Sequence, residues 1–93
     1  MTIWFEKGPG NYKYSGFVKM KNGHILGPVN FGNKNYPQYK DRVPLGLYSK
    51  MDHLDKKRRA NYRKRHGAIL TSTGKRAVDV KYSPAWFSWK YLW

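Results

Sequence analysis

Side chains suited to acid–base chemistry are few in this sequence and lie far apart. No two of the acidic residues have a spacing that favours general acid–base catalysis. No glycine-rich phosphate-binding loop precedes a helical pattern, and the absence of cysteine excludes disulfides, thiolate zinc sites and thiol catalysis. The sequence therefore predicts that the protein is not an enzyme. The acidic residues are Glu6, Asp41, Asp52, Asp55 and Asp79.

The three histidines do not form a metal site in this sequence. His24 follows Asn22-Gly23 and is expected to be a turn residue. His53 and His66 lie in one basic stretch with Asn61 between them, thirteen residues apart. A straight helix rises about 1.5 Å per residue, so both imidazoles could not bind the same ion. We therefore expect neither a metal ion nor another cofactor.

The remaining chemistry is that of cations, which gather in residues 52–67 (DHLDKKRRANYRKRHG). An ordinary solvated helix face is one explanation, but such faces usually mix signs because like charges four residues apart repel. Only Asp52 and Asp55 oppose the cations of this stretch, and this imbalance favours an anionic partner. The predicted nucleic-acid-binding residues are Lys56, Lys57, Arg58, Arg59, Tyr62, Arg63, Lys64, Arg65 and His66.

A helix over 52–67 is expected to position these cations. Asp52 is a suitable N-cap, because its carboxylate can accept from the free N–H groups of the first turn. Asp55 adds negative charge near the positive end of the helix dipole, and it precedes Arg59 by the four residues that suit an ion pair. Gly67 can end the helix in a left-handed conformation.

One stripe of this helix should face the rest of the protein. Leu54, Arg58 and Tyr62 follow one another at intervals of four, so Leu54 and Tyr62 are expected to contact the body. Arg58 could pack its aliphatic stem beside them. Arg59 and Arg63, four apart on another face, are expected to reach phosphates.

The chain that must hold this helix has 93 residues and a net charge of +14. Its length predicts one small domain with one core. Its charge draws it to polyanions: nucleic acid, an anionic membrane surface or an acidic protein. The N-terminus lacks the apolar run of a signal peptide, and no stretch approaches the length of a membrane span. We expect a protein that is not secreted and that resides in the cytosol, the nucleus or a particle.

Residues 1–50 have the pattern of a β-rich and loop part. Asn22-Gly23 predicts a two-residue hairpin turn, since both positions of that turn need positive φ. The following strand, 24–31, contains Gly27-Pro28, so it should be an edge strand or bulged. Residues 31–44 read as a loop, with Tyr36 and Tyr39 as anchors.

The C-terminal part combines a small hairpin and an aromatic helix in our prediction. Two short apolar runs around a turn at 71–75 indicate a hairpin over 68–82. Ser83 is a suitable N-cap and Pro84 a suitable first residue for a helix over 83–93. The fold class is therefore α+β.

The aromatic tail allows two interpretations. Its rings could fill the core, because an exposed aromatic cluster invites aggregation. They could instead dock on a partner, since Trp and Tyr dominate interface hot spots. In either case Trp86 and Trp89 should be largely buried. The candidate docking residues are Trp86, Phe87, Trp89, Tyr91 and Trp93.

Two motifs together resemble a family of small basic proteins encoded by large double-stranded DNA viruses. In that family a β-rich part with a Phe-Gly turn precedes a helix of pattern H-x-D-x-x-[KR]-R-x-x-Y-x-x-R-H and a tail of pattern S-P-[AS]-[YFW]-x-S-W-x-x-L-W. The first thirty residues of this chain do not carry the pattern. The family has no established activity, so the resemblance implies a viral origin, and with it a place in the virion or in the host cytoplasm or nucleus. The matching residues are Phe31, Gly32, Asp52, His53, Asp55, Arg58, Arg59, Tyr62, Arg65, His66, Ser83, Pro84, Trp86, Ser88, Trp89, Leu92 and Trp93.

Two functions from different classes fit these observations. In the first, a virion-associated protein binds viral nucleic acid, most simply DNA, through the basic helix and without sequence specificity, because phosphate contacts carry little sequence information. In the second, a minor capsid or cement protein meets acidic capsid surfaces with its cations and docks its aromatic tail into a neighbour. We favour the first, and the oligomeric state stays open.

Overall fold

A three-stranded antiparallel sheet forms the base of the fold. The computed structural model describes residues 1–93, and its strands β1 (Thr2–Lys7), β2 (Tyr12–Lys19) and β3 (Ile25–Asn33) lie in the order β1-β2-β3. β3 is therefore an edge strand, as expected, and its register with β2 shifts between Gly16 and Val18.

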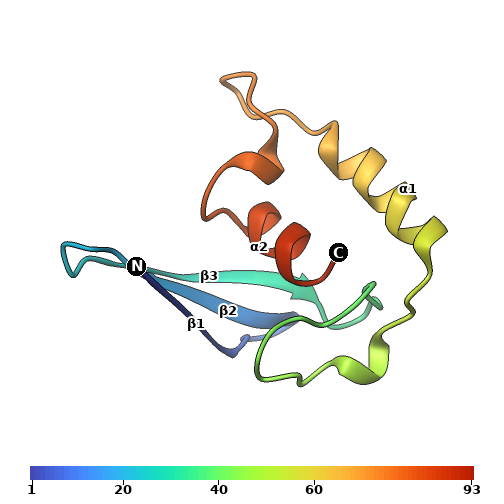
Figure 1. Ribbon diagram of the computed structural model, residues 1–93, viewed down its shortest axis with the longest axis horizontal. Helices are drawn as coiled ribbons and strands as arrows, with labels where there is room; N and C mark the ends of the chain where they lie inside the picture. Colours follow the sequence, from blue (N-terminus) through green and yellow to red (C-terminus); the bar gives the residue numbers. More distant parts are fainter.

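Two helices follow the sheet, α1 (Lys56–Gly67) and α2 (Pro84–Tyr91). Short 3-10 helices, η1 (Ser49–Met51) and η2 (Ala77–Asp79), lie in the connections. α2 lies over one face of the sheet, and α1 lies beyond α2 at the edge of the molecule (Figure 1). This arrangement confirms the α+β class in one small domain. Neither helix has the length and apolar character that crossing a bilayer requires.

The core lies between the sheet and α2 and is largely aromatic. Phe87 of α2 is fully buried and stacks on Phe31 of β3, with ring centroids 5.2 Å apart. Gly16 of β2 makes room for this ring: a Cβ at Gly16 would lie 2.8 Å from Phe87 Cε1. The tail is therefore part of the chain's own core, but Phe87 fills it, whereas Trp86 and Trp89 are only half-buried.

The β2–β3 turn lies where it was predicted but is of another type. Gly23 N–H donates to Met20 O (2.9 Å) and Met20 N–H donates to His24 O (2.8 Å), which encloses a three-residue loop. Gly23 has φ +86°, whereas Asn22 does not have positive φ. The expected two-residue turn at Asn22-Gly23 is wrong, because only the glycine is left-handed.

Helix α1 begins later than the sequence predicted. Asp55 is its N-cap, and the carboxylate accepts from the N–H groups of Lys57 (2.9 Å) and Arg58 (3.2 Å). Leu54 lies before the helix with φ +54° and is exposed, so the stripe that was expected to run from it to Tyr62 does not form.

The other end of α1 also differs from expectation. Gly67 is the last helical residue and its φ is not positive, so it does not provide a left-handed end. The predicted ion pair between Asp55 and Arg59 is absent as well, because the carboxylate of Asp55 is used at the N-cap.

Asp52 has a different role, in a polar network that holds the long connection between β3 and α1. Its Oδ1 accepts from Gln38 Nε2 (2.6 Å) and from the N–H of Asp41 (2.7 Å). Asp41 accepts in turn from the hydroxyl of Tyr14 (2.6 Å). Lys13 completes the network by donating to Gln38 Oε1, and burial lowers the pKa of its ammonium to about 8, although the two carboxylates oppose this shift.

The predicted hairpin over 68–82 forms only in part: the turn at 71–75 and an antiparallel bridge are present, but no extended strands. Only one bridge forms there, between Leu70 and Arg76. The tight turn in which Thr71 N–H donates to Lys75 O (2.7 Å) leaves no room for further pairs, and η2 begins directly afterwards and buries Val78. The start of α2 follows the prediction: Ser83 Oγ accepts from Trp86 N–H (3.1 Å), with proline at the first turn.

Candidate nucleic-acid interface

Helix α1 divides its cations between two faces. Its outer face is polar and exposed, whereas its inner residues are half-buried against the end of the chain. No residue of α1 is fully buried. The residues predicted to bind nucleic acid therefore divide into two groups that differ in solvent exposure. The exposed cations are Lys56, Lys57, Arg58, Lys64 and Arg65, and the half-buried residues are Arg59, Tyr62, Arg63 and His66.

The inner arginines attach α1 to the tail. Arg59 Nε donates to the main-chain oxygen of Trp93 (2.7 Å), and Arg63 Nη2 donates to the same oxygen (3.1 Å). Arg59 also lies over the ring of Tyr39, with Cζ 4.7 Å from the centroid. These two arginines were predicted to reach phosphates, and the structure instead gives both of them internal partners.

Stacked rings complete the attachment. Tyr62 lies parallel to Trp93, with centroids 4.0 Å apart and planes 5° apart, and His66 stacks on the other side of Tyr62 at 4.0 Å. Burial raises the pKa of the Tyr62 hydroxyl to about 12, opposed by Arg63 and Arg65. Burial also lowers the pKa of His66, and Arg65 adds to this effect. His66 is therefore a neutral stacking partner at pH 7 rather than a cation.

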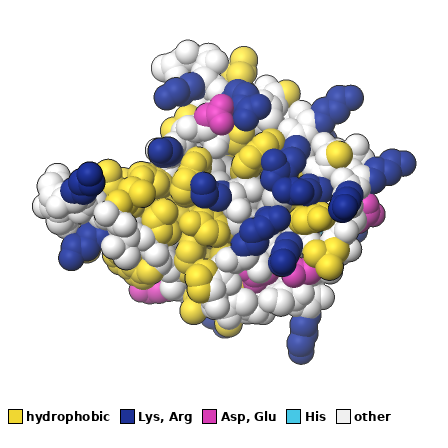
Figure 2. All heavy atoms as spheres, viewed as in Figure 1, with side chains coloured by type: hydrophobic (Ala, Val, Ile, Leu, Met, Phe, Trp, Pro, Cys, Tyr) yellow, Lys and Arg dark blue, Asp and Glu magenta, His cyan; other side chains and the backbone are white.

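Most of the acidic residues are occupied inside the fold. Asp41 and Asp52 belong to the buried network and Asp55 caps α1. The structure has one ion pair between side chains, Arg76–Asp79 (2.9 Å), so the other Lys and Arg side chains have no Asp or Glu partner. Figure 2 shows Lys and Arg side chains spread over the part of this face where α1 and α2 lie, with few Asp or Glu side chains among them. The surface around α1 is therefore strongly positive.

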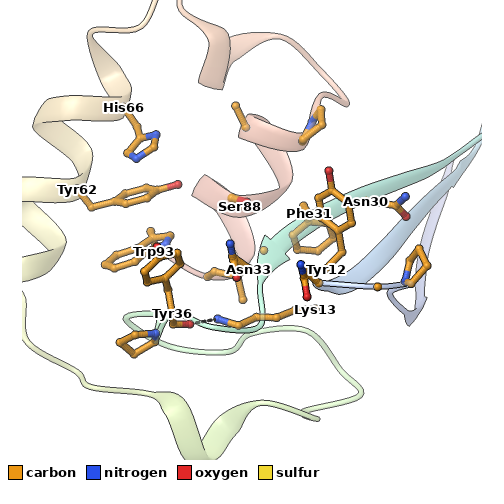
Figure 3. Close-up of a pocket in the computed structure, with 18 of the residues that line it drawn as sticks. Tyr12, Lys13, Asn30, Phe31, Asn33, Tyr36, Tyr62, His66, Ser88 and Trp93 are labelled. Carbon is orange, nitrogen blue, oxygen red and sulfur yellow. Dashed lines mark hydrogen bonds between the residues drawn. The ribbon is translucent and has the colours of Figure 1, made fainter.

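A groove of about 1090 Å³ lies between α1, the end of α2 and the β2–β3 edge. Tyr62 and His66 form its α1 side, and the hydroxyl end of Tyr62 points into it (Figure 3). Tyr12 lies on the opposite side, whereas Tyr36 lies below Tyr62 and Trp93 in Figure 3, and the two tyrosines keep 47% and 65% of their surface exposed. Tyr36 is thus not the anchor that was expected, because its main-chain oxygen, not its ring, is held by Lys13 Nζ (2.6 Å). Tyr39, the other expected anchor, is half-buried.

Asparagines give this groove hydrogen-bonding capacity. Asn30 Oδ1 accepts from Ser15 Oγ (2.6 Å) and Asn33 Oδ1 accepts from the N–H of Asn35 (2.8 Å). The amide NH₂ groups of Asn30 and Asn33 make no hydrogen bond within the chain, and both residues line the groove. Flat rings combined with free amide donors are suited to a planar, polar ligand.

A second, smaller cavity of about 520 Å³ lies between α1 and α2. Most of the residues around it are cationic, and two are tryptophans. It contains the half-buried arginines of α1 together with cations from three other segments. The lining residues are Arg42, Arg59, Arg63, Val78, Asp79, Lys81, Trp86, Trp89 and Lys90. We call this cavity the basic pocket.

The two distant histidines are not brought together. His53 Nδ1 accepts from the N–H of Asp55 (2.9 Å), ahead of α1, whereas His66 lies in its last turn. His53 instead contacts Trp93, the ring on which Tyr62 stacks, and the centroids of His53 and Trp93 are 5.3 Å apart. No group of three or more His, Asp or Glu side chains is arranged to hold a metal ion.

Sequence reasoning missed the residues outside the basic stretch. Arg42, Lys81 and Lys90 reach the basic pocket from a loop, from the segment before α2 and from α2 itself. Each is a single cation among 19, so no local pattern distinguishes it. Tyr12 and Asn33, at opposite ends of paired strands, meet at the groove only through the β2–β3 register, in which they are direct partners.

Comparison of the chain with protein-family models, curated proteins and solved structures found no match.

Proposed function

We propose that this protein binds nucleic acid without catalysing a reaction, and that the exposed face of α1 holds the phosphates. The observation that carries the proposal is the separation of charge. The carboxylates of Asp41, Asp52 and Asp55 are used in the network and at the cap, and the cations of α1 are left without acidic partners. Such a surface draws polyanions.

The exposed cations form two rows along the helix. Lys57 and Lys64 are seven residues apart, as are Arg58 and Arg65, so each row repeats after about two turns or roughly 10 Å. Rows of this kind can contact successive phosphates of one strand. The contacts carry affinity and little sequence information.

The groove beside α1 supports single-stranded nucleic acid over duplex. Tyr12 and Tyr36 present exposed rings there, and unpaired bases stack on such rings without regard to sequence. Paired bases inside a duplex are not available for this contact. The resemblance of α1 and the tail to the viral family is the support for placing the activity in a virion.

The test is a salt series with fluorescently labelled oligonucleotides, one single-stranded and one duplex. With at most five phosphates held, log affinity should fall against log salt with a slope no steeper than about −3.5 on the single strand and about −4.5 on duplex. The variant Lys57→Gln/Lys64→Gln should reduce the duplex slope by about 2. The variant Tyr12→Ala/Tyr36→Ala should weaken single-strand binding by at least tenfold and leave duplex binding unchanged, since stacking is worth about 1–3 kcal/mol per base.

A control variant with the same loss of charge is Lys19→Gln/Lys21→Gln. Both lysines are exposed near the β2–β3 turn, at the opposite end of the molecule from α1 (Figure 1). This control should keep the parental slope. If both double-lysine variants lose affinity equally, binding depends on total charge alone, and an acidic protein surface, such as that of a capsid, becomes the better partner.

A further inference from the structure

The basic pocket concentrates positive charge to a degree that the fold does not require. Five cations line this pocket, together with a single acidic residue, Asp79. Asp79 is already paired with Arg76, which does not line the pocket and which donates to it through Nε (2.9 Å) and Nη2 (3.3 Å). None of the five forms an ion pair with an Asp or Glu side chain, and Arg59 and Arg63 share the main-chain oxygen of Trp93. Like charges that line one pocket repel one another, so this arrangement is electrostatically costly. The five are Arg42, Arg59, Arg63, Lys81 and Lys90.

Four of these cations lie over aromatic rings, and Arg42 Cζ is 5.8 Å from the ring centroid of Tyr39. The guanidinium of Arg63 lies over Trp89, with Cζ 4.6 Å from the ring centroid. Lys90 Nζ lies 5.4 Å from the ring centroid of Trp86. Arg59 is fixed by Tyr39 and by Trp93 O, as described above. Side chains that are already ordered lose less entropy when a ligand binds.

Arg63 is the least well satisfied cation of the basic pocket. Its Nε is out of contact with solvent and has no hydrogen-bond partner in the chain. Burial lowers the pKa of this guanidinium, and the charges of Arg59 and Arg42 lower it further. An anion in the pocket would offset this cost through its charge, and not through a hydrogen bond to the Nε, which is closed to solvent.

We propose that the basic pocket binds a phosphate group. Phosphate matches the fork of N–H donors on arginine and supplies the negative charge that the pocket lacks. The cavity is larger than one phosphate, and the rings of Trp86 and Trp89 line the remaining space. The site is separate from the exposed face of α1, and it does not depend on the proposal that nucleic acid is the partner.

The first experiment is thermal unfolding in inorganic phosphate, with sodium chloride at the same ionic strength and pH as the reference. The parent should gain melting temperature with phosphate, and the gain should saturate. Lys81→Gln/Lys90→Gln removes two exposed pocket cations and should raise the apparent dissociation constant for phosphate at least tenfold. Lys19→Gln/Lys21→Gln removes the same charge near the β2–β3 turn, outside both the basic pocket and α1, and should keep the parental value.

A second measurement uses the unaltered protein. Phosphate titrated into ¹⁵N-labelled protein should shift the Nε–H signal of Arg63 and the indole signals of Trp86 and Trp89, and should leave the indole of Trp4, on the sheet, in place. Equal stabilisation by phosphate and chloride, equal effects of the two lysine pairs, or shifts spread over all four indoles would each overturn the proposal.

The source of the phosphate is settled by comparing two short oligonucleotides of one sequence, with and without a 5′-phosphate. Tighter binding of the phosphorylated strand, lost in Lys81→Gln/Lys90→Gln, assigns the site to a strand terminus. Equal binding of both strands, together with saturable stabilisation by inorganic phosphate, assigns it to free phosphate. If Lys57→Gln/Lys64→Gln did not affect nucleic-acid binding, that result would count against the proposed function but not against a phosphate site in the basic pocket.

Discussion

The close approach of Gly16 and Phe87 predicts that the effect of Gly16→Ala on stability changes sign when Phe87 is replaced. Gly16 lies in β2 without positive φ, so alanine fits its backbone there. In the parent, however, the new Cβ would lie 2.8 Å from Cε1 and Cζ of Phe87, closer than packed carbon atoms allow. Overpacking of this kind costs about 1–3 kcal/mol, so Gly16→Ala should destabilise the protein by that amount.

Phe87→Ala removes the ring with which that Cβ clashes. Alone it should cost about 3–5 kcal/mol, because the ring is fully buried and stacks on Phe31. In the Phe87→Ala background Gly16→Ala meets no ring and returns a methyl group to the space that the ring left. The double variant should therefore be at least as stable as Phe87→Ala alone, which implies a favourable coupling energy of about 1–3 kcal/mol.

Urea unfolding followed by tryptophan fluorescence and by far-UV circular dichroism measures these differences. The parent is expected to have a free energy of unfolding of about 5–14 kcal/mol, so Phe87→Ala must be studied at low temperature and with a stabilising co-solvent held constant across all four proteins. Additive effects, or a neutral Gly16→Ala in the parent, would refute the claim that Phe87 occupies the space above Gly16.

Further predictions concern the pH response and the acidic residues. Burial places the pKa of Lys13 at about 8 in the folded protein, below the ordinary lysine value of 10.5. The folded state therefore releases this proton first, and the free energy of unfolding should rise between pH 8 and about 10. Lys13→Met should flatten that rise in denaturant titrations. Asp55→Ala should cost about 1 kcal/mol and reduce helical circular dichroism, as loss of an N-cap does. Asp52→Ala should cost more, about 1–3 kcal/mol for each partner left unsatisfied, because Gln38 and the N–H of Asp41 lose their acceptor; an equal cost for the two aspartates would contradict their assigned roles.

Local signals predicted the elements well, and long-range contacts explain the errors. Ser83-Pro84 marked the start of α2 because a cap acts on its own first turn. Asp52 and Asp55 are both plausible caps within three residues of each other, and only the distant Gln38 draws Asp52 away from the helix. The predicted hairpin over 68–82 stops after one bridge for the same reason, since Val78 turns into the core instead of pairing.

The candidate site was predictable only in part. The basic helix was evident from its one-signed charge, but its division into an exposed and an attached face depends on where Trp93 lies. The groove and the basic pocket were not predictable, because their residues come from segments far apart in the sequence. Tyr12, for example, lies fifty residues before Tyr62, on the opposite wall of the same groove.

The way in which α1 is attached links its local stability to ligand binding. No side chain of α1 is fully buried, and stacking on Trp93 with two arginine hydrogen bonds holds the helix to the rest of the protein. Segments with so little buried apolar surface open at a lower free energy than the core, so α1 can detach while the sheet and α2 stay folded. Attachment of α1 also brings Arg59 and Arg63 towards Arg42, and the repulsion between these cations opposes the docking of α1. An anion held between α1 and α2 would remove that opposition, so ligand binding and helix docking would each strengthen the other by the same free energy.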